Sequence, residues 1–342
     1  MSRSLLSRAS NTQPWSNRSR LGFMLVLVIA LSGLHLLHGA RAISLTTLTQ
    51  ALFYYNPHDF DHRVLISLRL PRVLAMLLAG SCLAIAGYLL QVTLRNRLSD
   101  PQLLGLNSGA SLAVVLVTAF PIAPMFTLVR PLVASVGAGL LFSLVLLISS
   151  AGRKGLQPLK LIFCGIAFSA LAGAITSTVL ILDEDTLDQL RFWLIGDGAG
   201  SNLHSVLISL PFAGAGLALS LLIMPQLSAM SLGDAMAKGL GASIQKVRFF
   251  SLCAAALLTG SAVSVVGPIG FIGLICASLW RGIHSRPSVF SLLLVAFTGA
   301  ALLMAADIAA ISLFAPKELP TGALTGLVGA PVFLWIFVRR MR

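Results

Sequence analysis

The side chains that could carry out chemistry are few in this chain, and they are not grouped. Its 342 residues include six histidines and four cysteines. The cysteines all lie inside apolar runs, with neither C-x-x-C spacing nor a histidine neighbour, which is typical of small buried residues rather than metal ligands. They are Cys82, Cys164, Cys253 and Cys276. Ser, His and Asp are not spaced for nucleophilic catalysis either. We therefore expect no catalytic residue, no metal site and no enzyme.

The carboxylates argue against a carrier that works alone. All eleven Asp and Glu residues fall in loops or at the ends of the apolar runs. Ion-coupled carriers usually need an ionisable group at mid-membrane, where the ion is bound and released. The chain also lacks the G-x-x-x-x-G-K-[ST] loop that cradles ATP phosphates. An ion-coupled carrier or channel is thus the less favoured alternative, and we expect no cofactor of the chain's own.

A polar, basic segment, Leu227–Arg248, interrupts two long apolar runs. Ser231 and Asp234 have the S-x-x-D spacing of a helix N-cap followed by a carboxylate in the first turn. Apolar residues recur every fourth position, so the segment predicts a short amphipathic helix, which ends at Gly239. These residues are Leu232, Met236 and Leu240. Such a helix at the surface of a membrane protein suits a soluble partner; the alternative is a solvated loop that only joins two spans.

Composition predicts the elements that hold this segment. The chain is 57% hydrophobic and 10% charged, whereas soluble domains carry roughly 25% charged residues. Apolar runs of about 20 residues recur along it, which is the length of one bilayer crossing. We expect an all-α polytopic membrane protein with ten spans, of which the eighth is short and follows the broken sequence GPIGFIG. The spans are 21–40, 70–94, 103–121, 128–150, 159–182, 203–223, 247–267, 271–283, 288–306 and 320–338.

The net charge of +13 reports membrane orientation rather than nucleic-acid binding. With both termini in the cytoplasm, all but seven of the 24 Lys and Arg residues face inward, as the positive-inside rule requires. Residues 1–20 then form a cytoplasmic tail, and 21–342 form a single transmembrane domain with a cytoplasmic loop at about 226–246. A cleaved signal peptide ending near Ala40-Arg41-Ala42 is an alternative for the first span.

Two arginines depart from the charge bias. Arg69 and Arg72 lie just before the second span, on the predicted external side. They could anchor an acidic external partner through charge-assisted pairs, or they could contact lipid headgroups.

Five segments together resemble the FecCD/BtuC-type permeases, from about residue 65 to the C-terminus. These are the membrane subunits of type II ABC importers for iron-siderophores, haem and vitamin B12. The segments are LRLPRVLAMLLAGSCLAIAGYLLQ, RNRLSDPQLLGLNSGASLAVVL, LGDAMAKGLG, GPIGFIGLICASLWR and ELPTGALTGLVGAPVFLWIFVRR.

The resemblance implies a type II ABC importer permease fold of ten helices in a bacterial inner membrane. It also implies a second permease subunit, two cytoplasmic ATPase subunits that bind the ATP, and an external substrate-binding protein. LGDAMAKGLG would be the ATPase-coupling segment, Arg69 and Arg72 would dock the binding protein, and Asn96 and Leu98 would lie at the cytoplasmic gate. The coupling residues would be Leu232, Gly233, Asp234, Ala237, Leu240 and Gly241.

The chain departs from the family pattern at three places. Ile311 stands where the family often has a docking arginine, and Lys317 is the nearby cation that could replace it. Ala277-Ser278 replaces a Pro-His pair, and Arg97 replaces the proline of an Asn-Pro-Leu gate sequence. The segment LDQLRFWLIGDG, followed by Asn202-Leu203-His204, is most similar to the ferric-siderophore branch; haem and cobalamin are the alternative cargoes.

Overall fold

The computed structural model describes residues 17–39, 43–120, 130–151, 158–239, 241, 243–281, 287–313 and 317–341. Within these residues the chain is helical, and the predicted all-α class is confirmed. Seven helices are long and apolar enough to cross a membrane, and three shorter apolar helices complete the predicted ten. The ten are α1 (Asn17–Leu37), α4 (Leu70–Thr93), α5 (Leu106–Ala119), α6 (Arg130–Ser150), α7 (Pro158–Leu182), α9 (Leu203–Met230), α11 (Ile244–Val266), α12 (Ile272–Arg281), α13 (Val289–Ser312) and α14 (Thr321–Met341).

Three span boundaries differ from the prediction. The second span continues α3 (Phe60–Val64) and a π-helical turn, η1 (Leu65–Arg69), so its helix begins ten residues early. The sixth and ninth helices run on to Met230 and Ser312. Hydrophobicity marks where lipid begins, whereas helices continue for as long as their backbone hydrogen bonds can be satisfied. The remaining helices, α2 (Leu45–Phe53), α8 (Glu184–Ile195) and α10 (Asp234–Gly239), lie between spans.

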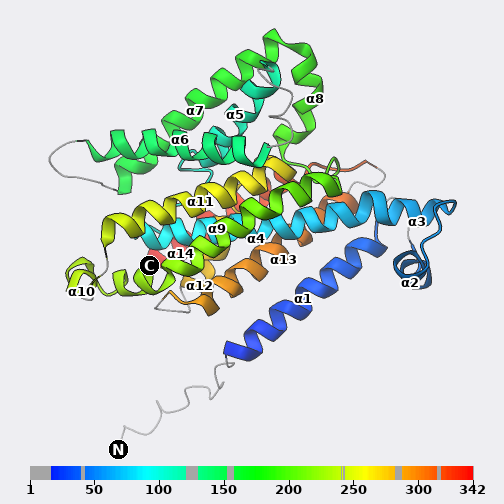
Figure 1. Ribbon diagram of the computed structural model, residues 1–342, viewed down its shortest axis with the longest axis horizontal. Coiled ribbons are helices and arrows are strands. Elements are labelled where there is room, and N and C mark those ends of the chain that lie inside the picture. The colour runs from blue at the N-terminus through cyan, green and yellow to red at the C-terminus, as the bar shows by residue number, and fades with distance from the viewer. Residues whose placement is uncertain are drawn as a thin grey trace, which may run out of the picture.

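Helices α4 and α11 form the centre of the bundle. In their apolar stretches 78% and 72% of residues are buried, against 11% in α1 and 17% in α7. Helix α4 packs on α11, α12 and α13, and α11 packs on α6 and α9. Figure 1 shows α10 at one end of this bundle and α2 and α3 at the other. The peripheral helices α1 and α7 therefore leave apolar side chains uncovered.

Small residues set the closest helix crossings, as the spacing of Gly80 and Gly87 on one face predicts. A Cβ atom at Gly80 would collide with the backbone of Gly299 in α13, and one at Gly87 with that of Gly273 in α12. Gly109 and Gly137 approach one another in the same way between α5 and α6. Because lipid gives helices no hydrophobic reason to associate, such close backbone contact is a main source of their packing.

Two non-helical segments meet inside the bundle. One, residues 94–105, precedes the short helix α5; the other, residues 267–271, precedes the short helix α12. The amide of Asn107 donates to the carbonyl of Ile269 at 2.9 Å, and the Gln102 side chain lies where any side chain at Gly270 would be. The sequence predicts the second break from GPIGFIG, and the first coincides with the predicted loop between the second and third spans, 95–102. Irregular backbone at this depth is tolerated because protein surrounds it.

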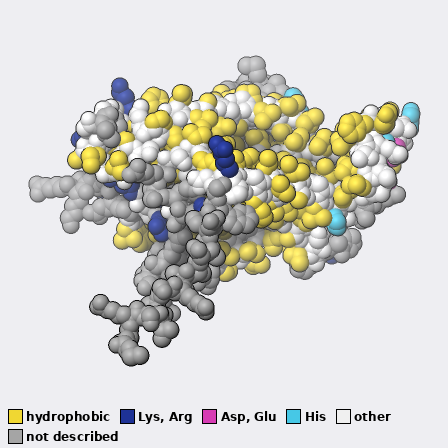
Figure 2. All heavy atoms as spheres, turned by 90° about the horizontal axis from the view of Figure 1, so that it is seen from below, with side chains coloured by type: hydrophobic (Ala, Val, Ile, Leu, Met, Phe, Trp, Pro, Cys, Tyr) yellow, Lys and Arg dark blue, Asp and Glu magenta, His cyan; other side chains and the backbone are white. Residues whose placement is uncertain are grey.

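The surface agrees with a membrane protein. Figure 2 shows hydrophobic side chains over most of the described face, with Lys and Arg mainly toward the α10 end and histidines toward the α2–α3 end. Large apolar side chains such as Leu147, Leu182 and Leu222 are 67%, 81% and 75% exposed. A face of this kind needs lipid or protein to cover it.

Candidate functional site

Arg72 is the centre of a buried ionic cluster at the α2–α3 end of the bundle. Its guanidinium donates two hydrogen bonds to the Asp307 carboxylate, with Nε–Oδ2 and Nη2–Oδ1 distances of 2.8 and 3.0 Å. Its Nη1 atom donates to Glu318 at 2.7 Å. His35 and the hydroxyl of Thr321 complete the hydrogen bonds to Asp307, the former at 2.6 Å. The cluster therefore joins α1, α4, α13 and the start of α14.

The position of Asp307 corrects one expectation. The sequence places every carboxylate in a loop or at a span end, but Asp307 lies inside α13, five residues before the helix ends, with a side chain that is 0% exposed. A cation and two further hydrogen-bond partners surround it there, which offsets the cost of burying a carboxylate. The two-point Arg72 contact explains its burial as structural, so it gives no support to ion coupling.

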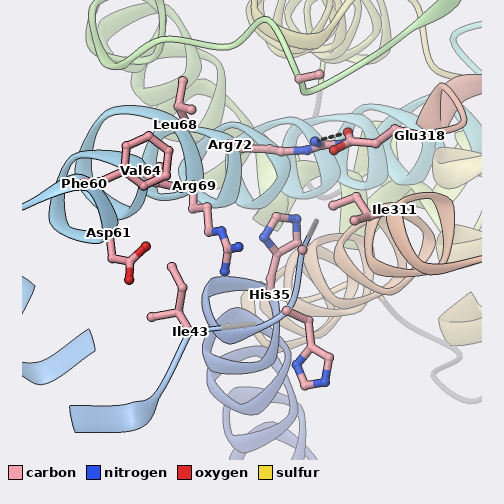
Figure 3. Close-up of a pocket in the computed structure, with 13 residues that line it drawn as sticks. His35, Ile43, Phe60, Asp61, Val64, Leu68, Arg69, Arg72, Ile311 and Glu318 are labelled. Atoms are coloured by element: carbon pink, nitrogen blue, oxygen red, sulfur yellow. Dashed lines mark hydrogen bonds and ion pairs between the residues drawn. The ribbon is translucent and has the colours of Figure 1, made fainter. Parts of the chain in front are cut away.

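A pocket of about 330 Å³ opens beside this cluster. Figure 3 shows Arg69, Asp61 and His35 facing it, with Ile43 below and Ile311 across from Arg72. Arg69 donates to the backbone carbonyl of Leu36 at 2.6 Å, which holds its side chain between the first two spans. The apolar Ile311, which stands in place of the expected docking arginine, is 8% exposed and lines the pocket.

The three predicted docking residues differ in exposure and in their partners. The Arg72 side chain is 9% exposed and already held by carboxylates, so a partner could bind it only by opening those pairs. Arg69 is partly exposed at the pocket, and Lys317 is exposed on the loop before α14. Asp197 approaches Arg72 at 3.7 Å, and burial raises the pKa of its carboxyl. Arg69 and Lys317 are thus the accessible cations of the three.

The predicted coupling segment forms the short helix α10 between α9 and α11. Gly233 and Gly241 flank it with φ angles of 112° and 83°, which L side chains rarely adopt. Leu232 and Met236 are 47% and 60% exposed, whereas Ala237 is 0% exposed and anchors the helix. Asp234 is the first helical residue, and its side chain, like the whole of Leu240, lies outside the described residues.

The predicted N-cap of this helix is wrong. Ser231 caps the end of α9 instead, and its hydroxyl donates to the Ser228 carbonyl at 2.6 Å. The cause is the length of α9, which extends seven residues past the predicted span and absorbs this serine. Gly239 ends α10, as the sequence predicts.

The predicted gate residues lie in the tight turn after α4. The Asn96 side chain accepts a hydrogen bond from the backbone N–H of Leu98 at 3.0 Å, which forms an Asx turn around Arg97. Arg95, with a φ of 51°, donates to the carbonyl of Met230 at 2.6 Å. This bond joins the turn to Met230, the last residue of α9, two residues before the coupling segment 232–241 begins. Sequence reasoning missed Arg95, because its acceptor is a backbone atom 135 residues away.

The described residues contain no group of three or more His, Cys, Asp or Glu side chains arranged to hold a metal ion. At the position of the family's Pro-His pair, Ser278 accepts a hydrogen bond from Gln91 at 3.3 Å. Ala277-Ser278, which replaces that pair, is therefore part of the contact between α4 and α12.

Comparisons with known proteins match nearly the whole chain to one family and one fold. A model of the FecCD transport family matches residues 24–339. The iron(3+)-hydroxamate import system permease FhuB of Bacillus subtilis is 36% identical over 98% of this chain and 88% of its own length. The vitamin B12 import system permease BtuC of Vibrio vulnificus is 36% identical over 94% of both. A solved inward-facing structure, titled a putative metal-chelate type ABC transporter, superposes with a TM-score of 0.78 at 27% identity, covering 94% of this chain and 99% of the other.

Proposed function

Because this chain belongs to the FecCD transport family, we propose that it is the membrane-spanning permease subunit of an ATP-driven importer for a ferric siderophore. The observation that carries the proposal is α10, a short helix set between two long spans and flanked by two glycines with positive φ. Met236 on this helix and Leu232 just before it are exposed at the end of the bundle, as a binding surface for a soluble motor would require. The chain itself needs no ATP site.

The surfaces that the described helices leave uncovered suggest which proteins bind this chain. Two ATPase subunits would bind the coupling segments of two permeases, one on each. The second permease, identical or homologous, would cover apolar side chains of peripheral spans such as α7, and lipid would cover the rest. An external binding protein would dock at the opposite end, through Arg69 and Lys317. Both termini lie in the cytoplasm of a bacterial cell in this arrangement, and the chain lies in its inner membrane.

The cargo is a ferric siderophore. A hydroxamate permease matches nearly the whole chain, and the solved structure with the same fold is titled a metal-chelate type transporter. The chelate encloses its iron, so the permease needs no metal ligand. Vitamin B12 is the second candidate cargo, because a permease for it is equally similar; haem is a third.

The coupling helix is tested by Met236→Asp, since Met236 is 60% exposed and a charge there leaves the bundle packing unchanged. We expect ATPase binding to weaken more than tenfold, as for an interface anchor worth about 2 kcal/mol. Co-purification of the ATPase with the full-length permease and siderophore uptake by cells are the measurements.

The matched control is Leu52→Asp, which puts the same charge on an exposed leucine at the opposite end, in α2. It should leave ATPase co-purification unchanged. Equal behaviour of the two variants would contradict the proposed role of α10.

A further inference from the structure

An apolar groove of about 570 Å³ runs between α6 and α11 on the surface of the bundle. Figure 1 shows the two helices side by side, in agreement with their many contacts. A Cβ atom at Gly139 would contact Ala256, and one at Gly260 would meet Ser135, so the two helices are antiparallel. The lining on α11 begins at Phe249, less than two turns from the start of that helix. The groove therefore reaches the α10 end of the bundle, which is the predicted cytoplasmic side.

The lining of this groove suits hydrocarbon rather than a polar ligand. Leu, Val, Phe and Ala side chains make up most of it. Its two serines, Ser135 and Ser143, each donate their hydroxyl hydrogen to a carbonyl four residues earlier in α6, at 2.6 and 2.7 Å. Both hydroxyls are thus satisfied within their own helix, and the removal of apolar surface from contact with other groups is the main interaction that the groove offers.

The groove is too small to hold a helix of a partner protein. Its lining on α11 extends from Phe249 to Leu257, which is a rise of about 12 Å along the helix. A helix with its side chains is about 10 Å across, so this length of helix occupies about 900 Å³. The groove offers about 570 Å³. A single flexible hydrocarbon chain is much narrower than a helix, and it can lie within this space.

Positive charges border the groove where it reaches the α10 end. Lys246 is exposed and precedes Phe249 by three residues, so it lies on the same face of α11. Arg248, two residues further on, is half-buried, and the first turn of α11 holds no acidic residue. On the other side, Lys160 donates to the carbonyl of Ala151, just beyond the end of α6. Cations from two sides therefore lie at the level expected for lipid headgroups.

We propose that this groove binds one anionic phospholipid, whose acyl chain lies between α6 and α11 and whose phosphate headgroup is held by Lys246. The long stem of a lysine can pack along apolar surface while its ammonium group reaches the headgroup. Each Lys or Arg near the cytoplasmic leaflet strengthens the binding of an anionic lipid by about fivefold. The proposal concerns the lipid-facing side of the permease, so it does not depend on the cargo or on the importer function.

Lipid selectivity provides the first test. Dioleoyl phosphatidylglycerol and dioleoyl phosphatidylcholine have the same acyl chains, and only the first carries a net negative charge. Each is titrated onto the purified full-length chain in detergent, and native mass spectrometry gives the number of bound lipids and their affinities. We expect one phosphatidylglycerol to bind at least fivefold more tightly than phosphatidylcholine. Equal affinities for the two lipids would overturn the proposal.

Reversal of one charge provides the second test. Lys246→Glu should lower the affinity for phosphatidylglycerol about tenfold, because it removes one attraction to the phosphate and adds a repulsion. The affinity for phosphatidylcholine should stay at the wild-type value. Arg18→Glu is the matched control, since Arg18 is also exposed on the predicted cytoplasmic side but lies in α1, which packs on α13. An equal loss in both variants would show a response to net charge alone and would overturn the site.

Filling the groove provides the third test. Ser143 lines the groove and is exposed, whereas the next residue, Leu144, is 46% exposed and does not line it. Ser143→Trp should lower phosphatidylglycerol binding more than tenfold, and Leu144→Trp should leave it at the wild-type value.

Two outcomes would contradict this assignment of the groove. Unchanged affinity in both Lys246→Glu and Ser143→Trp would overturn the lipid site. If Ser143→Trp instead converts a dimer of the purified chain to monomers, as measured by its mass in detergent, and lipid binding is unchanged, the groove is an interface with a second copy and the lipid proposal is overturned.

Discussion

At the scale of single residues, the Arg72–Asp307 pair shows how a charge is accommodated between apolar spans. Each group would be costly to bury alone, and their two-point contact offsets that cost only while both are present. His35 and Thr321 occupy the remaining lone pairs of the carboxylate. The pair therefore fixes the relative positions of α4 and α13 at the α2–α3 end of the bundle.

Removal of one partner should be destabilising. Asp307→Ala leaves the Arg72 guanidinium buried with Glu318 as its remaining strong partner, so we expect a loss of about 3 kcal/mol in the free energy of unfolding. Glu318→Gln, at a side chain that is 37% exposed, should cost about 1 kcal/mol or less. Thermal unfolding of the two purified variants and the wild type in detergent measures these losses. A smaller loss for Asp307→Ala than for Glu318→Gln would refute this account.

The sequence identifies Arg72 as unusual but not its partner, because Asp307 is 235 residues away and follows the predicted end of its span. When its partner is unknown, an arginine predicted on the external side is interpreted as a docking residue. The same limit applies to Arg95, whose acceptor is a backbone carbonyl that carries no sequence signal. Local features such as the end of α10 at Gly239 are predictable, since they depend on neighbouring residues alone.

At the scale of the elements, the α4–α13 crossing depends on two facing glycines. A side chain at Gly80 would meet the backbone of Gly299, which cannot move aside as a flexible side chain could. Gly80→Val should therefore separate the helices and cost about 1–3 kcal/mol. Gly214→Val, at a glycine with nothing within 4 Å, should cost far less. Melting temperatures of the two purified variants give the comparison, and equal values would refute the role of the crossing.

The spacing of small residues predicts this crossing but also suggests one that the described part of the chain does not form. Gly322 packs against the backbone of Ile195, whereas Gly326, its G-x-x-x-G partner, meets nothing within 4 Å. A four-residue spacing shows which residues share a face but not whether another helix reaches it.

At the scale of the whole molecule, ten apolar helices and their charge bias specify the topology. Lys238 and Lys317 are both exposed, the first in α10 and the second before α14, and the positive-inside count puts them on opposite sides. In a background with the four native cysteines replaced by alanine, Lys317→Cys should react with a membrane-impermeant thiol reagent in intact spheroplasts. Lys238→Cys should react only after the membrane is opened. Labelling of Lys238→Cys in intact spheroplasts would contradict the predicted orientation.

The number of spans is predictable from hydropathy because each crossing needs about 20 apolar residues whatever its neighbours are. Their arrangement is not, since centre and periphery are equally apolar: α1 and α4 have mean hydropathies of 2.0 and 2.2 but 11% and 78% burial. Which helix is central is decided by glycine contacts and buried polar pairs between distant parts of the chain.

The bond between His35 and Asp307 has a consequence for how the protein is made. Its two residues are 272 positions apart, so nearly the whole chain must leave the ribosome and enter the bilayer before this bond can form. Until then α1 is joined to the second span by the Arg69 bond to the Leu36 carbonyl, and the face that later packs on α13 stays in lipid, for which its apolar surface is suited. Packing of the first helix against α13 is therefore among the last steps of assembly.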